Sequence, residues 1–503
     1  MPSGIGAVKA DRMRQMRAAL TPEFCGRLLL PGDGDYERRR TVWNAMVDRR
    51  PAAIAVCTST LDVVRAVDAA RAEGLPLSVR GGGHSVSGHA LCDGGLTIDL
   101  SGMRRVTVRA GQGLVEAEGG CRLADLDPAT AAHGLVVPAG TVSETGLGGL
   151  ALGGGTGWLT RSYGLTCDNL VACEVVLADG RVVEASATER ADLFWALRGG
   201  GGNFGIVTRF TLRAHRFGPG MLVAASLYGP EEAHEALAAY ADLAPGLPRQ
   251  IGWHASLKKR LPAYPFVPAE RVGSPGLLLI AMWLGDAADP AAAQVRSLTQ
   301  VGRPSAQECL VLPFADGVQR LMDAEFPDGQ RYYTKAAHLR GLDEEAISET
   351  VRFWTEMPMG GEIVLLGLGG ALRDVPEPDS AFSHRGCPWW LEFLLHWQDP
   401  RSDAPYVRQV REAVGRIGDC VAAGSYLNMR NADEGDDVRT LTEAYEGPEK
   451  YARLRQVKSR YDPGNTFRCN WNTPPADDPL SGARTRQPLP RAADQDKGDT
   501  CPS

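Results

Sequence analysis

Two different hydrophobic periods alternate near the start of the chain, and they predict strands and helices in turn. Residues 52–57 and 76–79 are short apolar runs typical of buried strands, whereas residues 60–74 between them carry apolar side chains at helical spacing. Gly74 is a candidate helix stop. This order predicts a βαβ-like unit at the opening of the fold.

The same alternation of predicted strands and helices continues to about residue 218. Strands are predicted where apolar and polar positions alternate, and Asp179-Gly180 is the candidate turn of a hairpin. The predicted strands are 95–100, 106–120, 174–180, 181–185 and 206–212, and the predicted helices are 123–134 and 191–198.

Beyond about residue 219 the predicted strands become longer and richer in apolar and aromatic residues. Acidic helical stretches such as residues 230–244 separate them, which predicts an antiparallel sheet flanked by helices. The strands are expected at 222–229, 251–259, 277–286, 362–372 and 389–398, and a last helix is expected at 449–461. Residues 1–40 are polar and are predicted to form a short helical lead-in, whereas residues 477–503 are predicted to be a disordered tail.

Composition excludes several functional classes. The chain has 503 residues, 44% of them hydrophobic, and a formal net charge of −7, so nucleic acid and anionic membrane surfaces are not expected partners. We find no signal peptide and no run of about 18 uncharged apolar residues. The 11 cysteines are scattered without a CxxC pair, which favours reduced thiols, a cytoplasmic location and no metal site.

Glycine is the compositional outlier, and it points to a cofactor. Of the 59 glycines, 27 lie between Gly81 and Gly205. Residues 200–205 fit G-x-G-x-x-G, but a helix precedes them and a strand follows, which is the reverse of the order that a dinucleotide fold requires. In the loop from Arg80 to Gly88, three glycines lead directly to His84, so the backbone can approach an anion while one imidazole projects. A lone histidine is usually structural, but two further glycine clusters follow within 75 residues.

These motifs closely resemble the berberine-bridge-enzyme-like branch of the vanillyl-alcohol-oxidase flavoproteins. The motifs are Arg80-Gly-Gly-Gly-His84-Ser85-x-x-Gly88, Pro138-Ala-Gly140, Thr145-Gly146, Gly149, Gly153-Gly-Gly155-x-Gly157, Tyr163-Gly-Leu-x-x-Asp168-Asn169, Leu197-Arg-Gly-Gly-Gly-Gly-Asn-Phe-Gly-Ile-Val207 and Lys458-x-x-Tyr461-Asp-Pro-x-Asn-x-Phe467. The resemblance covers about residues 40–475. It implies an α+β protein: a PCMH-type FAD-binding domain of two α/β subdomains over 41–218, completed by 426–476, with a substrate domain inserted at 219–425.

The resemblance also implies how FAD is held. His84 matches the histidine that is bonded to the flavin 8α-methyl carbon, and Val142 stands where many relatives have a second, cysteine link, so attachment through His84 only is expected. Cys121 and Cys167 are expected to be buried packing thiols. The residues expected to contact FAD are Arg80, Gly81, Gly82, Gly83, His84, Ser85, Gly88, Gly140, Thr141, Thr145, Gly146, Gly149, Gly155, Gly157, Asp168, Asn169, Gly202, Gly205, Ile206, Val207, Asn470 and Asn472.

The expected catalytic residues are Tyr426, Asn428, Thr145 and Val142. Tyr426-Leu-Asn428 resembles the Tyr-x-Asn motif that enters the active site of the family, although the second tyrosine of many relatives is replaced here, and Tyr426 as a core tyrosine remains an alternative. Thr145 and Val142 are expected beside the flavin, where the smaller threonine in place of leucine would leave room for oxygen.

On the substrate side, His254, Glu392 and His396 lie on predicted strands that could face the flavin. With regular alternation, Glu392 and His396 point to one side of their strand and the neighbouring leucines to the other. The function expected is oxidation of a small organic substrate by hydride transfer to covalent FAD, with O2 as acceptor. The alternatives are an oxygenase that inserts oxygen into a polyketide-like substrate, and a non-catalytic flavin-binding protein.

Overall fold

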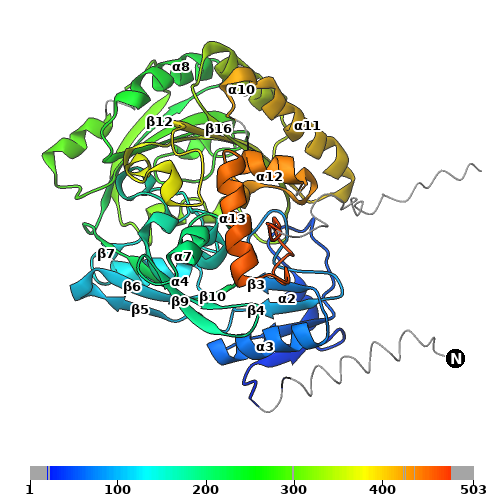
Figure 1. The fold of residues 1–503 in the computed structure, drawn as a ribbon. Helices are drawn as coiled ribbons and strands as arrows, with labels where there is room; N and C mark the ends of the chain where they lie inside the picture. The colour runs from blue at the N-terminus through cyan, green and yellow to red at the C-terminus, as the bar shows by residue number, and fades with distance from the viewer. Residues whose placement is uncertain are drawn as a thin grey trace, which may run out of the picture.

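Three main sheets make up the fold, and helices cover one face of the largest (Figure 1). The computed structural model describes residues 23–296, 300–422, 426–435 and 437–476, together with Leu20 and Gly424. The predicted tail 477–503 and most of residues 1–22 lie outside the described residues. The mixture of helices and sheets confirms the predicted α+β class.

The first sheet contains the strand–helix–strand unit expected from the sequence. Its order is β1-β2-β4-β3, and β2 (Ala53–Val56) and β3 (Leu77–Arg80) both run parallel to β4 (Leu96–Asp99), which lies between them. Helix α3 (Thr60–Ala72) connects β2 to β3; it begins where the Ser59 side chain accepts a hydrogen bond from the Asp62 amide.

The described part of the lead-in differs from the prediction. Residues 27–29 were expected to be helical, but β1 (Arg27–Leu29) is a strand that pairs antiparallel with β2. Within residues 23–40, only α2 (Tyr36–Arg40) is helical. The short apolar run of β1 therefore extends a sheet edge, which the polar composition around it concealed.

The second sheet is antiparallel and has the order β5-β6-β10-β8-β9. Gly180, at φ 85°, makes the predicted turn of the β8–β9 hairpin. The strands are β5 (Val106–Arg109), β6 (Leu114–Glu118), β8 (Leu170–Val176), β9 (Val182–Ser186) and β10 (Ile206–Arg213). The helices are α4 (Leu123–Ala131), α5 (Leu147–Leu152), α6 (Thr160–Tyr163) and α7 (Ala191–Leu197), and β7 (Leu135–Val136) pairs with β11 (His215–Arg216).

The third sheet has seven strands, all antiparallel, in the order β15-β12-β14-β13-β17-β18-β16. The strands are β12 (Met221–Tyr228), β13 (Ile251–Lys258), β14 (Gly276–Trp283), β15 (Ala306–Leu312), β16 (Arg331–Leu339), β17 (Gly361–Gly367) and β18 (Trp389–Trp397). The two edge strands, β15 and β16, were not predicted. Both carry charged residues within the strand, so the sequence lacks the continuous apolar run by which the central strands were recognised.

Side-chain alternation gives the third sheet two different faces. Ala255 and Leu257 of β13 and Leu391 of β18 belong to a core formed with α8 (Ala233–Leu243), α10 (Glu344–Glu356) and α11 (Asp403–Arg416). In Figure 1 these helices lie along the outer side of the molecule. The alternate residues of β13, β17 and β18 therefore point toward the two smaller sheets.

The C-terminal segment returns from the large sheet to the N-terminal part. It contains α12 (Val438–Ala444) and α13 (Pro448–Tyr461), which lies in front of the junction in Figure 1. Fully buried Lys458 pairs with Asp462 at 2.6 Å and donates to the backbone oxygen of Asn203 at 2.7 Å. The domain limits 41–218, 219–425 and 426–476 stay a prediction, and these sheet memberships are the observation that supports them.

Candidate active site

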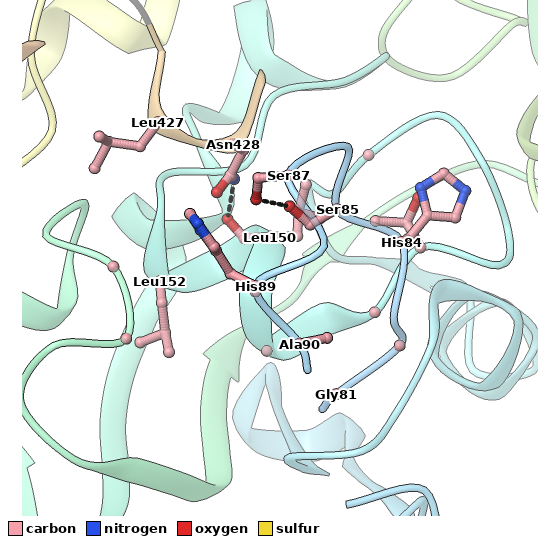
Figure 2. A pocket seen from close by; sticks show the side chains of 18 of the residues that line it. Gly81, His84, Ser85, Ser87, His89, Ala90, Leu150, Leu152, Leu427 and Asn428 are labelled. Carbon is pink, nitrogen blue, oxygen red and sulfur yellow. Dashed lines mark hydrogen bonds between the residues drawn. The ribbon is translucent and has the colours of Figure 1, made fainter. Parts of the chain in front are cut away.

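A cavity of about 380 Å³ lies where the glycine loops meet the inner face of the large sheet. One wall is the backbone of the loop from Gly81 to Ala90 (Figure 2). Residues of β17 and β18 and of the segment 426–429 also line the cavity. Segments from all three predicted parts of the chain therefore meet at one site.

The glycines of this cavity keep two loops in contact and leave space beside them. A Cβ atom on Gly82 would lie 2.4 Å from the backbone nitrogen of Gly146, so these loops touch through bare backbone. At Gly149 a Cβ would meet nothing within 4 Å, and at Gly202 nothing closer than 3.9 Å. Exposed backbone N–H groups beside open space suit the phosphates of a dinucleotide, so the cavity fits FAD.

His84 and His89 are the two histidines of the loop from Gly81 to Ala90, and His84 is the one that directly follows the three glycines. Its Nε2 atom is buried and has no hydrogen-bond partner among the described residues. Burial lowers the pKa of the imidazole to about 4, so the ring is neutral at physiological pH. A neutral ring keeps a lone pair on one nitrogen, which is the form required of a nucleophile.

Most residues expected to contact FAD line this cavity. They are Gly81, Gly82, Gly83, His84, Ser85, Gly140, Thr141, Thr145, Gly146, Gly149, Gly202, Gly205, Ile206, Val207 and Asn470. The expected residues that are not among its lining are Arg80, Gly88, Gly155, Gly157, Asp168, Asn169 and Asn472.

Several of the residues that do not line the cavity hold the surrounding loops in place. Asp168 forms a buried, two-pronged ion pair with Arg385 of the substrate region, at 2.7 and 3.0 Å. Asn169 donates to two carbonyl oxygens of its own loop. A Cβ on Gly157 would lie 1.9 Å from the carbonyl oxygen of Ala139, so this glycine permits a close backbone crossing. These contacts hold the loops in place, and contact of these residues with FAD stays a prediction.

Tyr426 and Asn428 reach the cavity as expected. The Tyr426 hydroxyl oxygen accepts hydrogen bonds from the backbone N–H of Gly155 at 2.7 Å and from Asn428 Nδ2 at 2.8 Å. Asn428 also donates to the carbonyl oxygen of Leu150 at 3.1 Å, as Figure 2 shows. Burial raises the pKa of Tyr426, so at neutral pH it is a phenol that can donate its own proton.

Glu392 and His254 line the cavity on the sheet side, but His396 is not among the lining residues. The alternation on β18 was predicted correctly, since Glu392 and His396 share a face. His396, however, lies four residues further on, about 13 Å along the strand. Its ring lies beside Tyr332 of the edge strand β16, with centroids 5.9 Å apart.

Glu392 is the carboxyl group in contact with the cavity. Burial raises its pKa to about 7, although Thr334 Oγ1 donates a hydrogen bond to it at 2.7 Å. Burial lowers the pKa of His254 to about 4, and neither of its ring nitrogens has a partner among the described residues. A carboxyl poised near neutrality can take up a proton when substrate binds.

Val142 and Thr145 were expected beside the flavin, where oxygen would approach it. Val142, Thr145 and Leu150 all line the cavity. Cys121 and Cys167 are buried free thiols whose pKa burial raises, to about 12 for Cys121, so they have the packing character expected of them.

Some cavity residues were missed by the sequence analysis. Trp43 lies before the first motif, and Met322 and Phe326 lie in a loop where no motif marks them. Cys469 also lines the cavity, and a hydrogen bond from the Cys92 thiol lowers its pKa to about 7. The Gly-His motif continues to His89, but the resemblance was carried only to Gly88.

Across the part of the chain that the structure describes, no helix is long and apolar enough to cross a membrane. Within the same residues, no group of three histidine, cysteine or acidic side chains is placed to hold a metal ion.

Comparisons with known proteins identify the family. Residues 51–186 match the family model of an FAD binding domain, and residues 425–474 match the model "Berberine and berberine like". The (R)-6-hydroxynicotine oxidase of Paenarthrobacter nicotinovorans is 31% identical over 465 residues, covering 90% of this chain and 97% of that protein.

Solved structures agree in fold. A crystal structure of 6-hydroxy-D-nicotine oxidase from Arthrobacter nicotinovorans has a TM-score of 0.78 at 27% identity, over 90% of this chain and 99% of that one. Glucooligosaccharide oxidase from Acremonium strictum, described with a 6-S-cysteinyl, 8α-N1-histidyl FAD, has a TM-score of 0.78 at 25% identity, over 92% and 99% of the two chains. With the glycine cradle and these likenesses, the chain belongs to the berberine-bridge-enzyme-like family of FAD-linked oxidoreductases.

Proposed function

We propose that this enzyme is an oxidase that takes hydride from a carbon bearing an amine or hydroxyl group, with O2 as the electron acceptor. The observation that carries the proposal is one cavity that is lined both by the glycine loop carrying His84 and by the sheet strand carrying Glu392. Bound FAD supplies the hydride acceptor and, once reduced, the donor of electrons to oxygen. A cytoplasmic location is part of the proposal and rests on the scattered cysteines.

FAD attachment is proposed to be through His84 alone. Val142 occupies the sequence position expected for a second, cysteinyl link, and it lines the cavity. A valine side chain has no nucleophilic atom, so it cannot form such a bond. The first link is supported by the neutral imidazole of His84, whose Nε2 atom has no hydrogen-bond partner among the described residues.

Glu392 is proposed as the group that accepts the proton from substrate. Two groups are candidates for this role, and their ionisation favours Glu392. Burial raises the pKa of Tyr426 far from neutrality, whereas it raises that of Glu392 only to about 7. Tyr426 is better suited to donate a hydrogen bond to the substrate, because its oxygen already accepts two.

The walls around Glu392 favour a compact, largely apolar substrate. The neighbouring lining residues are Met322, Phe326, Val364, Leu366, Trp390 and Leu394. An oligosaccharide needs many hydrogen-bond partners, whereas a heterocyclic amine or phenol needs one polar anchor on an apolar wall.

A panel of cyclic amines, phenolic alcohols and oligosaccharides, mixed anaerobically with the enzyme, tests the proposal. Bleaching of the flavin absorbance by amines or phenolic alcohols is expected. Bleaching by oligosaccharides alone would contradict the substrate class, and failure of the whole panel would contradict the oxidase. With ¹⁸O2, label that enters peroxide and not the product is expected for an oxidase; label in the product would indicate the oxygenase.

Tyr426→Phe is expected to keep full FAD loading and to slow anaerobic flavin reduction about five- to tenfold, the effect of one lost hydrogen bond. The loss should appear in the limiting rate at saturating substrate rather than in substrate affinity. Tyr240→Phe is the control for the loss of a buried phenol hydroxyl outside the cavity. Reduction of Tyr426→Phe at the wild-type rate would leave Tyr426 a packing residue.

Thr145→Leu is expected to slow reoxidation by O2 at least about tenfold, a barrier higher by about 1.4 kcal/mol, since the larger side chain fills space beside Val142. Flavin reduction by substrate should change little. Stopped-flow mixing of the reduced enzyme with oxygenated buffer measures the effect, and Thr145→Val is the control of similar volume. Equal reoxidation of the leucine and valine variants would disprove this route for oxygen.

A further inference from the structure

Trp43 lies between the histidine of the glycine loop and the edge strand of the large sheet. Its ring stacks on His84, with centroids 4.3 Å apart and planes at 15°. Its other stacking partner is Tyr332 of β16, at 3.7 Å and 18°. The three rings therefore connect the FAD-binding loop with the substrate sheet. No sequence motif indicated this contact.

The indole is held firmly in this place. Trp43 Nε1 donates to the carbonyl oxygen of Phe326 at 2.9 Å, and the Trp43 backbone N–H donates to the carbonyl oxygen of Gly83 at 3.1 Å. The adjacent Asn44 donates to the carbonyl oxygens of Val86 and Tyr332, both at 3.0 Å. Trp43 cannot rotate away without disturbing the segment on each side.

Apart from this stack, the His84 ring makes a hydrogen bond to its own backbone. Its Nε2 atom has no hydrogen-bond partner among the described residues, and the ring lies against the cavity. The indole covers one face of the imidazole, so the stack restricts how the ring can turn about its χ angles. A nucleophile that is held in one orientation reacts far faster than one that must be ordered during the reaction.

We propose that Trp43 is a positioning residue for covalent attachment of FAD, holding the His84 ring in the orientation in which the bond forms. This inference rests on the proposed link at His84. The bond joins a ring nitrogen of His84 to the 8α carbon of the flavin. The methyl group and the imidazole each lose one proton, the two electrons from the broken C–H bond reduce the flavin ring, and O2 reoxidises it with formation of hydrogen peroxide.

The second stacking partner adds a condition to this step. Because Tyr332 belongs to β16, the stack is complete only when the edge of the large sheet is in place against the loop. Attachment is therefore coupled to docking of the substrate region. Removing the Tyr332 ring should slow FAD attachment less than removing the Trp43 indole, because Trp43 would still stack on His84.

The test measures the flavin that stays with the protein after acid precipitation, as a fraction of total bound flavin. Trp43→Leu and Trp43→Met are expected to bind FAD yet to attach it at least about tenfold more slowly. Trp43→Phe should restore attachment, since it restores a ring face, and Tyr332→Leu should fall between. Thermal unfolding of each variant with FAD shows which are folded, and methionine preserves most of the apolar volume.

The outcomes separate this inference from the proposed link. If the wild-type enzyme carries no covalent flavin, the link at His84 fails. If the wild type is covalently loaded and folded Trp43→Met attaches FAD at the same rate, the link stands and the positioning role of Trp43 is wrong. A phenylalanine variant as slow as the methionine variant would also overturn it, because stacking would then not be the cause.

Discussion

Replacing His84 with alanine is expected to abolish covalent flavin attachment completely. The wild-type protein should stay yellow after acid precipitation, whereas His84→Ala should release all its FAD into the supernatant. The physical reason is that His84 follows the three glycines directly, at the position that matches the attachment histidine of the family, and Val142 offers no nucleophile at the second position. Absorbance of the pellet and supernatant measures the result.

His89→Gln is the matched control for this experiment. His89 lines the same cavity five positions further along, and its ring makes an edge contact with Trp471 at 4.6 Å. The control should therefore remain covalently loaded. Mass mapping of flavin-bearing peptides should find only the His84 peptide. A flavin attached to a cysteine, or a yellow pellet from His84→Ala, would contradict the single link.

Glu392→Gln is expected to lower the rate of flavin reduction by about 10²- to 10⁴-fold, the usual contribution of a general base. The pH dependence of the flavin-reduction rate shows in which direction protonation of Glu392 acts. Because the pKa of Glu392 is raised from 4.5 to about 7, the carboxyl is protonated below pH 7 and cannot accept a proton there. The wild-type rate should rise with pH through about 7 and then level off, and Glu392→Gln should lack this rise.

Thr334→Val provides a sharper test of the same carboxyl. The Thr334 hydroxyl donates to Glu392 and thereby lowers its pKa. Valine has a similar shape and no donor, so the rising limb should move to higher pH, by about one unit. If Glu392 had only a structural role, Thr334→Val would not change the pH at which the rate of flavin reduction rises. A wild-type reduction rate in Glu392→Gln would exclude it as the base.

The cofactor loops could be predicted from sequence because their chemistry is local. Three glycines followed by His84 place bare backbone and an imidazole within a few bonds of one another, whatever the rest of the chain does. The strands of the large sheet were predicted where both faces are buried, as in β13 and β14. Strands β15 and β16 were missed because Glu308 in β15 and Lys335 in β16 interrupt their apolar runs.

Motif membership did not distinguish residues that line the cavity from residues that support it. Asp168 lies in a conspicuous motif, but its partner Arg385 is 217 positions away, so only the folded chain shows that it is an anchor between two regions. In the same way, the prediction that His396 shares a face with Glu392 was sound, but alternation carries no information about where along a strand the cavity ends.

The sequence by itself determined the α+β class, the FAD-binding loops, the histidine at their tip and the absence of a cysteine at position 142. These depend on residue type and on spacing along the chain. Only the tertiary structure decided that Glu392 has a pKa near 7 and that Trp43 stacks on His84. Burial and ring stacking depend on segments that are far apart in sequence, and no local pattern specifies which of them will meet.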